Sequence, residues 1–189
     1  MTVHITQQAF RQVLDALSFP GKVNKLAEGP NAISVFIPQT GLVCQTLLDS
    51  EVTFYVAGDE PNISKMVQAY TGSHITNIKE ADFVIFPLML SLEEALTSLK
   101  SVKVGDLVNP HNSATIIYEV ESLVAGYTYK LVGPGIKDIN TLTCSLNPAI
   151  FEIRKEINTE YPLGIDLIII DRQGNVMGIP RTTQITEVM

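Results

Sequence analysis

The segment that decides the fold class is residues 52–99, VTFYVAGDEPNISKMVQAYTGSHITNIKEADFVIFPLMLSLEEALTSL. Its first part, VTFYVAG at 52–58, and its later part, ADFVIFPL at 81–88, are rich in β-branched and aromatic residues and predict two strands. Residues 62–70 predict a helix between these strands, and LEEALTSL predicts a second helix after them. Strands that alternate with helices of this length predict an α/β fold with a largely parallel or mixed sheet, covered by helices on both faces.

The N-terminal part predicts one helix, one strand and a second helix. Thr6 can cap a first helix, which Pro20 and Gly21 end. Residues 31–38, NAISVFIP, predict a short buried strand, and a helix is expected from about Thr40 to Leu48. Apolar residues recur at helical spacing in the first helix and are expected to face the core: Phe10, Val13, Leu14 and Leu17.

The middle of the chain predicts a capped helix followed by an antiparallel pair of strands. Ser91 and Glu94 have the spacing of a capping box for the helix over LEEALTSL. Farther along, SATIIYEVESL at 113–123 and YTYKLVG at 127–133 are separated by only three residues. This spacing predicts that the two strands pair with each other, as a small antiparallel addition to the fold.

The C-terminal part predicts a helix and then a hairpin. Asn147 is placed to cap a helix that Pro148 begins, and the helix is expected to stop before Pro162. GIDLIIID at 164–171 predicts a buried strand, and the turn at 172–175 returns the chain into VMGIP. The face of the helix that is expected to be buried carries three isoleucines: Ile150, Ile153 and Ile157.

Length and composition predict one domain over residues 1–189 that meets another protein or has an unusually rich core. The chain has 46% hydrophobic and 17% charged residues and a mean hydropathy of +0.21. The excess of apolar residues fits a subunit interface and a rich core about equally. The net charge is −7, and the 13 basic residues form no run, which argues against nucleic acid as a partner.

We expect the protein to be soluble and cytoplasmic. No apolar run in the sequence is long enough to cross a bilayer, and the N-terminus has no signal-peptide pattern. Cys44 and Cys144 are far apart in sequence and belong to no metal or redox motif, so both are expected to be reduced and packed.

The common catalytic motifs do not occur in the sequence. It has no P-loop, no GxSxG elbow and no SxxK pair. Gly133-Pro134-Gly135 is better explained as a tight turn than as a phosphate loop, because it lacks the three-glycine spacing. The histidines are isolated from one another and from the cysteines, so no metal site is expected: His4, His74 and His111. No cofactor is expected either.

The exception is a polar group near the C-terminus. Asp166 lies inside an apolar strand, where an unpaired carboxylate would be costly, and Arg181 is its natural partner. Thr182 and Thr183 place two hydroxyls beside that guanidinium. The group is either a structural pair that fixes the hairpin, which we favour, or a site for a phosphate or carboxylate.

At these residues the chain resembles a known family. YPLGIDLI at 161–168 and GIPRTT at 178–183 are similar to the C-terminal signature of the H subunit of bacterial carbon-phosphorus lyase. The N-terminal helix and the SFPG stop at 18–21 are similar to the start of that family. Tyr70, where that family is expected to have a histidine, and Phe19, in place of a polar residue, depart from its pattern.

The resemblance implies a subunit of the machinery for alkylphosphonate utilisation. In that system ATP and methylphosphonate are joined as ribose 1-methylphosphonate 5-triphosphate, and a radical enzyme that uses S-adenosylmethionine later cleaves the carbon-phosphorus bond. The nucleosidase activity belongs to the I subunit and the radical chemistry to the J subunit, which is the expected direct partner. The family also resembles pyridoxal-phosphate transferases in fold but lacks their cofactor site.

Two functions follow as hypotheses. The first is a subunit without a catalytic centre, which docks on the other subunits of the lyase, with a second copy of itself as a further partner. The second is a phosphate- or nucleotide-binding protein with a pocket around Arg11, Asp166 and Arg181. A free-standing pyridoxal-phosphate enzyme would need a lysine in a pocket beside a strand, and no lysine has an evident one.

Overall fold

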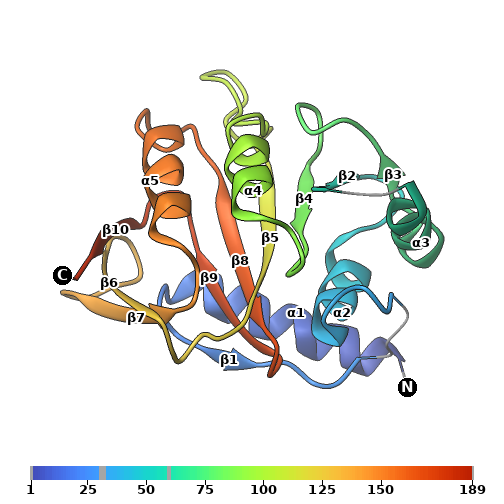
Figure 1. Cartoon of the computed structure of the whole chain (residues 1–189), viewed down its shortest axis with the longest axis horizontal. Helices are drawn as coiled ribbons and strands as arrows, with labels where there is room; N and C mark the ends of the chain where they lie inside the picture. The colour runs from blue at the N-terminus through green and yellow to red at the C-terminus, as the bar shows by residue number, and fades with distance from the viewer. Residues whose placement is uncertain (1, 30–32, 59–60, 189) are drawn as a thin grey trace.

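The fold is built on a seven-stranded mixed sheet (Figure 1). The computed structural model describes residues 2–29, 33–58 and 61–188. The strands β8, β5, β4, β2 and β3 run parallel to one another, whereas β9 runs antiparallel to both β8 and β1. In spatial order the strands are β1 (Asn24–Lys25), β9 (Asn175–Ile179), β8 (Asp166–Asp171), β5 (Thr115–Val120), β4 (Phe83–Phe86), β2 (Thr53–Val56) and β3 (His74–Ile75).

Helices cover both faces of this sheet, as the sequence predicted. Two buried clusters lie on opposite faces, and adjacent residues of β5 alternate between them, with Ile116 in one cluster and Ile117 in the other. Figure 1 shows α4 and α5 in front of β5 and β8, and α1 behind them. The helices are α1 (Thr2–Ser18), α2 (Pro38–Leu47), α3 (Pro61–Thr71), α4 (Leu92–Leu99) and α5 (Pro148–Ile157).

A smaller antiparallel sheet has the order β10 (Gln184–Glu187), β6 (Tyr127–Val132) and β7 (Asn140–Cys144). An antiparallel addition was expected here, but its predicted pairing of 113–123 with 127–133 is wrong. β5 pairs in parallel with β4 and β8, and β6 pairs with β7 and β10. Burial explains the difference: nearly all of β5 is buried, so it needs cover on both faces, whereas β6 alternates between buried and exposed residues.

The first helix differs from its prediction in its start and in its buried face. It begins at Thr2, so Thr6 lies inside the helix and is not its N-cap. Val13 is buried, but Phe10 and Leu14 are 48% and 53% exposed. The face with the small residues Ala9 and Ala16 is buried instead. That face allows close approach to β9, where a Cβ at Gly178 would come within 2.6 Å of the backbone of α1.

The strand predicted over residues 31–38 is also not found. Residues 33–36 form a turn, α2 begins at Pro38, and residues 31 and 32 lie outside the described part of the chain. Ile33 and Phe36 are nevertheless buried, so the apolar run was correctly assigned to the core but not to a strand. A short apolar run does not distinguish a strand from a packed turn.

The remaining local predictions are confirmed. Ser91 and Glu94 form the capping box of α4, and the Asn147 side chain accepts a hydrogen bond from the amide of Ala149 at 3.0 Å at the start of α5. The predicted strands at 52–58 and 81–88 contain β2 and β4, and the C-terminal hairpin is β8 and β9.

Candidate functional site

The first site to consider is the predicted pair of Asp166, at the start of β8, and Arg181, just after β9. The Arg181 Nη2 lies 2.5 Å from Asp166 Oδ2, and the Arg181 backbone amide donates to Oδ1 at 2.7 Å. The Arg181 Nη1 donates to the carbonyl of Pro110 at 2.9 Å. Both side chains are about four-fifths buried, at 19% and 23% exposure. The pair therefore connects the hairpin to the loop before β5, and most of its hydrogen-bonding capacity is used inside the chain.

The other predicted site residues occupy different places. Arg11 is exposed on α1, whose buried residues belong to the cluster on the opposite face of the sheet from α5. No hydrogen bond or ion pair among the described residues joins Arg11 to Asp166 or Arg181. Thr182 is half-buried. Thr183 is 2% exposed, and its hydroxyl has no hydrogen-bond partner in the described part of the chain.

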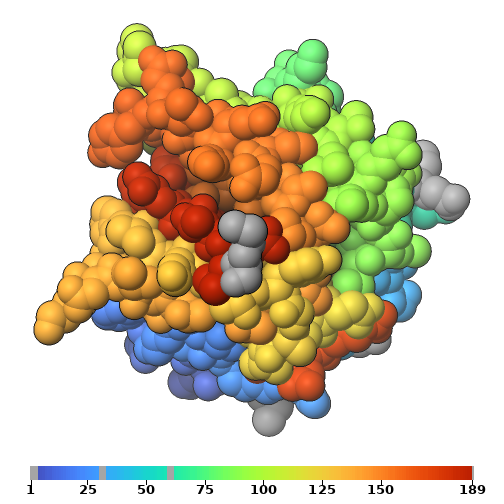
Figure 2. Space-filling model, turned by 60° about the vertical axis from the view of Figure 1, so that its left-hand side comes forward, coloured from blue at the N-terminus to red at the C-terminus, as the bar shows by residue number. Residues whose placement is uncertain are grey.

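Next to this pair lies a pocket of about 360 Å³ between α5 and β10. Its wall includes Arg181 and Thr183, together with Arg154 and Lys155 of α5 and Asn158 at the end of that helix. Three basic residues border the pocket, and no acidic residue of the described chain does. Figure 2 looks onto this side of the molecule, which is hollowed where the orange of α5 meets the red of the C-terminal segment.

Arg154 is the least expected member of this wall. It is 2% exposed, and no described carboxylate lies within 4.0 Å of its guanidinium. Two of its nitrogens donate to the carbonyls of Thr183, at 3.1 Å, and Pro180, at 2.5 Å, while its Nε has no partner among the described residues. Burial lowers the pKa of Arg154 to about 10, against the opposing effect of Asp166, so the side chain remains a cation at neutral pH.

The sequence analysis missed Arg154, although a signal was present. Position 154 is four residues after Ile150 and one after Ile153, so it lies on the apolar face of α5. A basic residue on a buried helix face needs polar partners, which only the folded chain could supply.

A second hollow lies at the carboxyl ends of the parallel strands. α3 follows β2 onto one face of the sheet and α4 follows β4 onto the other, so the chain leaves these adjacent strands in opposite directions. A cavity of about 530 Å³ lies between the two connections, with Gly58, Met66, Met89 and Leu90 in its wall. The cavity has a mainly apolar wall and no basic residue among those described.

An adjoining cavity of about 550 Å³ contains Glu119, at the end of β5. Its carboxylate is buried and accepts hydrogen bonds from the amides of Ile37, at 2.7 Å, and Leu88, at 2.9 Å. Burial raises the pKa of Glu119 despite these hydrogen bonds. Both carboxylate oxygens thus hold loops that follow strands, which gives Glu119 a structural role at this edge.

The thiols and the metal-ligating groups form no centre in the part of the chain that is described. Cys44 and Cys144 are unpaired and buried, and burial raises the pKa of Cys144 to about 11, which keeps it protonated at neutral pH. The described residues contain no group of three or more histidine, cysteine or acidic side chains that could hold a metal ion. Among the described helices, none is long and apolar enough to span a membrane.

Comparison with known proteins identifies the family. The family model described as "Bacterial phosphonate metabolism protein (PhnH)" matches residues 1–186. The chain belongs to this family. The resemblance to the H subunit of carbon-phosphorus lyase, seen in residues 161–168 and 178–183, is therefore confirmed over almost the whole chain.

Two curated relatives are similar to this chain over nearly its full length, and the names of both describe subunits. The putative C-P lyase subunit protein HtxG of Stutzerimonas stutzeri is 32% identical over 95% of this chain and 85% of the relative. The alpha-D-ribose 1-methylphosphonate 5-triphosphate synthase subunit PhnH of Rhizobium meliloti (strain 1021) is 27% identical over 95% of this chain and 89% of the relative.

Proposed function

We propose that this chain is a subunit of a carbon-phosphorus lyase complex for alkylphosphonate utilisation. In this role it supports the formation of ribose 1-methylphosphonate 5-triphosphate from ATP and methylphosphonate, without a catalytic centre of its own. The observation that carries the proposal is the family match over residues 1–186, together with a relative named as a subunit of the synthase that makes this compound. The use of Asp166 and Arg181 in bonds within the chain supports a structural role for these two residues of the C-terminal signature.

The outer face of α1 is the proposed docking surface for the other subunits, the radical-enzyme J subunit first among them. Phe10 and Leu14 lie one helical turn apart, and both are about half exposed. Phe19, just after the helix, is 52% exposed. Two large apolar side chains on one exposed face of the helix, with a third exposed just beyond its end, favour contact with another protein. A second copy of this chain is the alternative occupant of the face and would make a homodimer.

Three further proposals concern the chain as a whole. Residues 1–189 form a single domain, because residues of the small sheet, Tyr129 and Leu142 among them, share one buried cluster with the large sheet. The fold is related to that of pyridoxal-phosphate transferases, which the mixed sheet with helices on both faces supports. The site of action is the cytoplasm, which the buried free thiols of Cys44 and Cys144 support.

Co-expression with the other core subunits tests the subunit proposal. The complex is purified through a tag on this chain, and the stoichiometry is measured by native mass spectrometry. The wild-type chain should bring down the other subunits, and Phe10→Glu combined with Leu14→Glu should not, since two charges would be buried at the interface. Leu107→Glu combined with Val108→Glu is the matched control, because these apolar residues are exposed on a loop away from α1.

Each outcome bears on a different part of the proposal. If the α1 variant still assembles, α1 is not the docking surface, and if it loses only a second copy of this chain, the face makes the homodimer. If the wild-type chain copurifies with none of the subunits, and if cells that lack it grow normally on methylphosphonate, the subunit proposal is wrong.

The second candidate is a protein that binds a phosphate group or nucleotide near Arg181. The specific observation in its favour is the basic pocket that Arg181 borders. Arg11, which the hypothesis placed in this pocket, is not among the described residues of its wall. Arg154 provides the buried cation at this place.

A further inference from the structure

We infer that the pocket between α5 and β10 binds a tetrahedral oxyanion, the phosphate or phosphonate group of a small organic molecule. Arg154 supplies the central positive charge, Lys155 a second charge at the rim, and Thr183 a hydroxyl on the wall. The limitation to phosphate and phosphonate rests on the proposed function, whereas the presence of an anion site rests on the geometry alone.

The charge distribution around the pocket is the first argument. The protein has a net charge of −7, with 20 acidic and 13 basic residues. Against this background, the pocket wall holds Arg154, Lys155 and Arg181 and no described acidic residue. Asp166 neutralises Arg181, but Arg154 and Lys155 have no described ion-pair partner. A local positive charge that the chain does not neutralise attracts an anion into the pocket.

The unsatisfied polar atoms in the wall are the second argument. The Nε of Arg154 and the hydroxyl oxygen of Thr183 are buried and have no hydrogen-bond partner among the described residues. Both residues border the same pocket, and each is 2% exposed. Buried polar groups are normally hydrogen-bonded, because a donor without an acceptor loses its interaction with water and gains nothing in return. An oxyanion in the pocket offers several acceptor oxygens to such donors.

The rigidity of the wall is the third argument. The carbonyls of Thr183 and Pro180 fix two nitrogens of Arg154, and Asp166 fixes Arg181 at the start of the same segment. Asn158 further holds this segment, because its side-chain amide donates to the carbonyl of Arg181 at 3.2 Å. The two arginines are thus held in place before a ligand arrives, and binding requires little additional ordering of their side chains.

The size of the pocket limits the ligand. A volume of about 360 Å³ lies at the lower end of the range found for small-molecule sites. It suits a phosphate or phosphonate group with a small organic substituent and is too small to enclose a dinucleotide.

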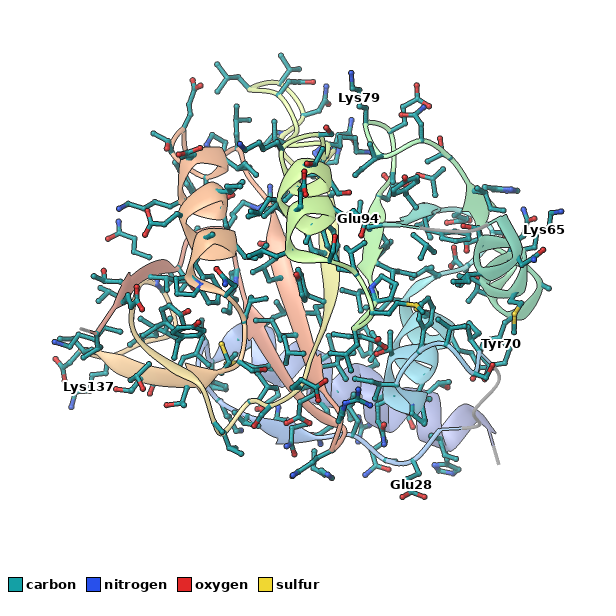
Figure 3. All side chains as sticks on the ribbon, viewed as in Figure 1. Glu28, Lys65, Tyr70, Lys79, Glu94 and Lys137 are labelled. Carbon is teal, nitrogen blue, oxygen red and sulfur yellow. The ribbon has the colours of Figure 1, made fainter. Side chains whose placement is uncertain are left out.

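Calorimetric titration of the full chain with inorganic phosphate and with methylphosphonate tests the site. Thr183→Val is the main variant, since it removes a hydroxyl that makes no hydrogen bond within the described chain and keeps the shape of the side chain. Lys155→Glu reverses an exposed charge at the rim, and the fold should tolerate it. Lys65→Glu is the matched control, since Lys65 is exposed on α3, at the other end of the sheet from α5 (Figure 3).

The wild-type chain and Lys65→Glu should bind at least one of the two anions with equal affinity. Lys155→Glu and Thr183→Val should each weaken that binding by about tenfold, because each removes one charged or charge-assisted contact. Their unfolding midpoints in urea should match that of the wild type. A preference for methylphosphonate would assign the site to phosphonates, and a preference for phosphate would assign it to phosphate esters.

Two results would overturn the inference: binding of neither anion at millimolar concentration, or binding that Lys155→Glu and Thr183→Val leave unchanged. This test needs no other subunit, so its failure is distinct from failure of the proposed function. A chain that joins the lyase complex but binds no anion overturns the site alone. A chain that binds methylphosphonate but joins no complex overturns the subunit proposal alone.

Discussion

Replacement of Asp166 by alanine should destabilise the protein by about 3 kcal/mol. Asp166 accepts hydrogen bonds from the backbone amide of Arg181 at 2.7 Å, from its Nη2 at 2.5 Å and from its Nε at 3.2 Å. Removal of one partner of a fully buried ion pair costs about 3–5 kcal/mol, because the other charge stays buried without compensation. Here 19% and 23% of the two side chains remain exposed, so water offsets part of the loss and the lower end of that range applies.

A double-mutant cycle measures how much of this loss belongs to the pair itself. The four proteins are the wild type, Asp166→Ala, Arg181→Met and the double variant, and their free energies of unfolding come from urea titrations at pH 7. The summed losses of unfolding free energy in the two single variants should exceed the loss in the double variant by about 2 kcal/mol, which is the coupling energy of the pair. The reason is that once one partner is gone, the other contributes little.

The chain contains a matched control for this cycle. Arg172 and Glu121 also form a two-contact ion pair, at 2.5 Å and 3.1 Å, but each side chain is 61% exposed. The coupling energy of an exposed pair is about 0.2–1 kcal/mol. If the Asp166–Arg181 coupling is no larger than that of the exposed pair, burial does not strengthen it. The conclusion that this pair is mainly structural would then be refuted.

Three further predictions follow from local geometry. Ser91→Ala removes the N-cap of α4 and should lower the free energy of unfolding by about 1 kcal/mol in urea titrations. Gly126→Ala should lower the free energy of unfolding by about 2 kcal/mol or more, seen as a melting temperature several degrees lower. Gly126 has a φ of +124°, and a Cβ there would lie 2.4 Å from a backbone oxygen. Burial acts to raise the pKa of Asp82, but the hydrogen bonds from Lys103 and Thr53 have the larger combined effect. The pKa of Asp82 therefore lies below its usual value. The stability that Asp82 contributes is therefore full above pH 3.8 and is lost as the pH falls through the pKa of Asp82 in the folded chain. In urea titrations, the wild type should have a higher free energy of unfolding than Asp82→Asn at neutral pH, and this difference should disappear in acid.

The outward face of α1 shows how a wrong structural prediction can change a functional one. The periodicity correctly identified an amphipathic helix, but it assigned Phe10 and Leu14 to the core. Large apolar residues usually mark the buried face of a helix, and here the small ones do, because β9 approaches the helix backbone at Gly178. The large residues are therefore exposed, which is why this face is the proposed docking surface.

Part of the candidate site could be predicted from the sequence. Asp166 begins the first strand of one hairpin and Arg181 follows the second strand, so the turn at 172–175 brings them together. The pocket next to them could not be predicted in the same way. It requires α5 and β10 to lie side by side, and β10 was not among the predicted strands.

By itself, the sequence determined what depends on near neighbours. The capped starts of α4 and α5, the β8–β9 hairpin and the alternation of strands and helices all follow from residues within one or two turns of each other. The family signature likewise depends on order and spacing along the chain. Only the tertiary structure decided which strands pair, which face of α1 is buried and where Arg154 finds its partners. These outcomes depend on contacts between distant segments, in which several arrangements satisfy the local pattern and only the packing of the whole chain selects one.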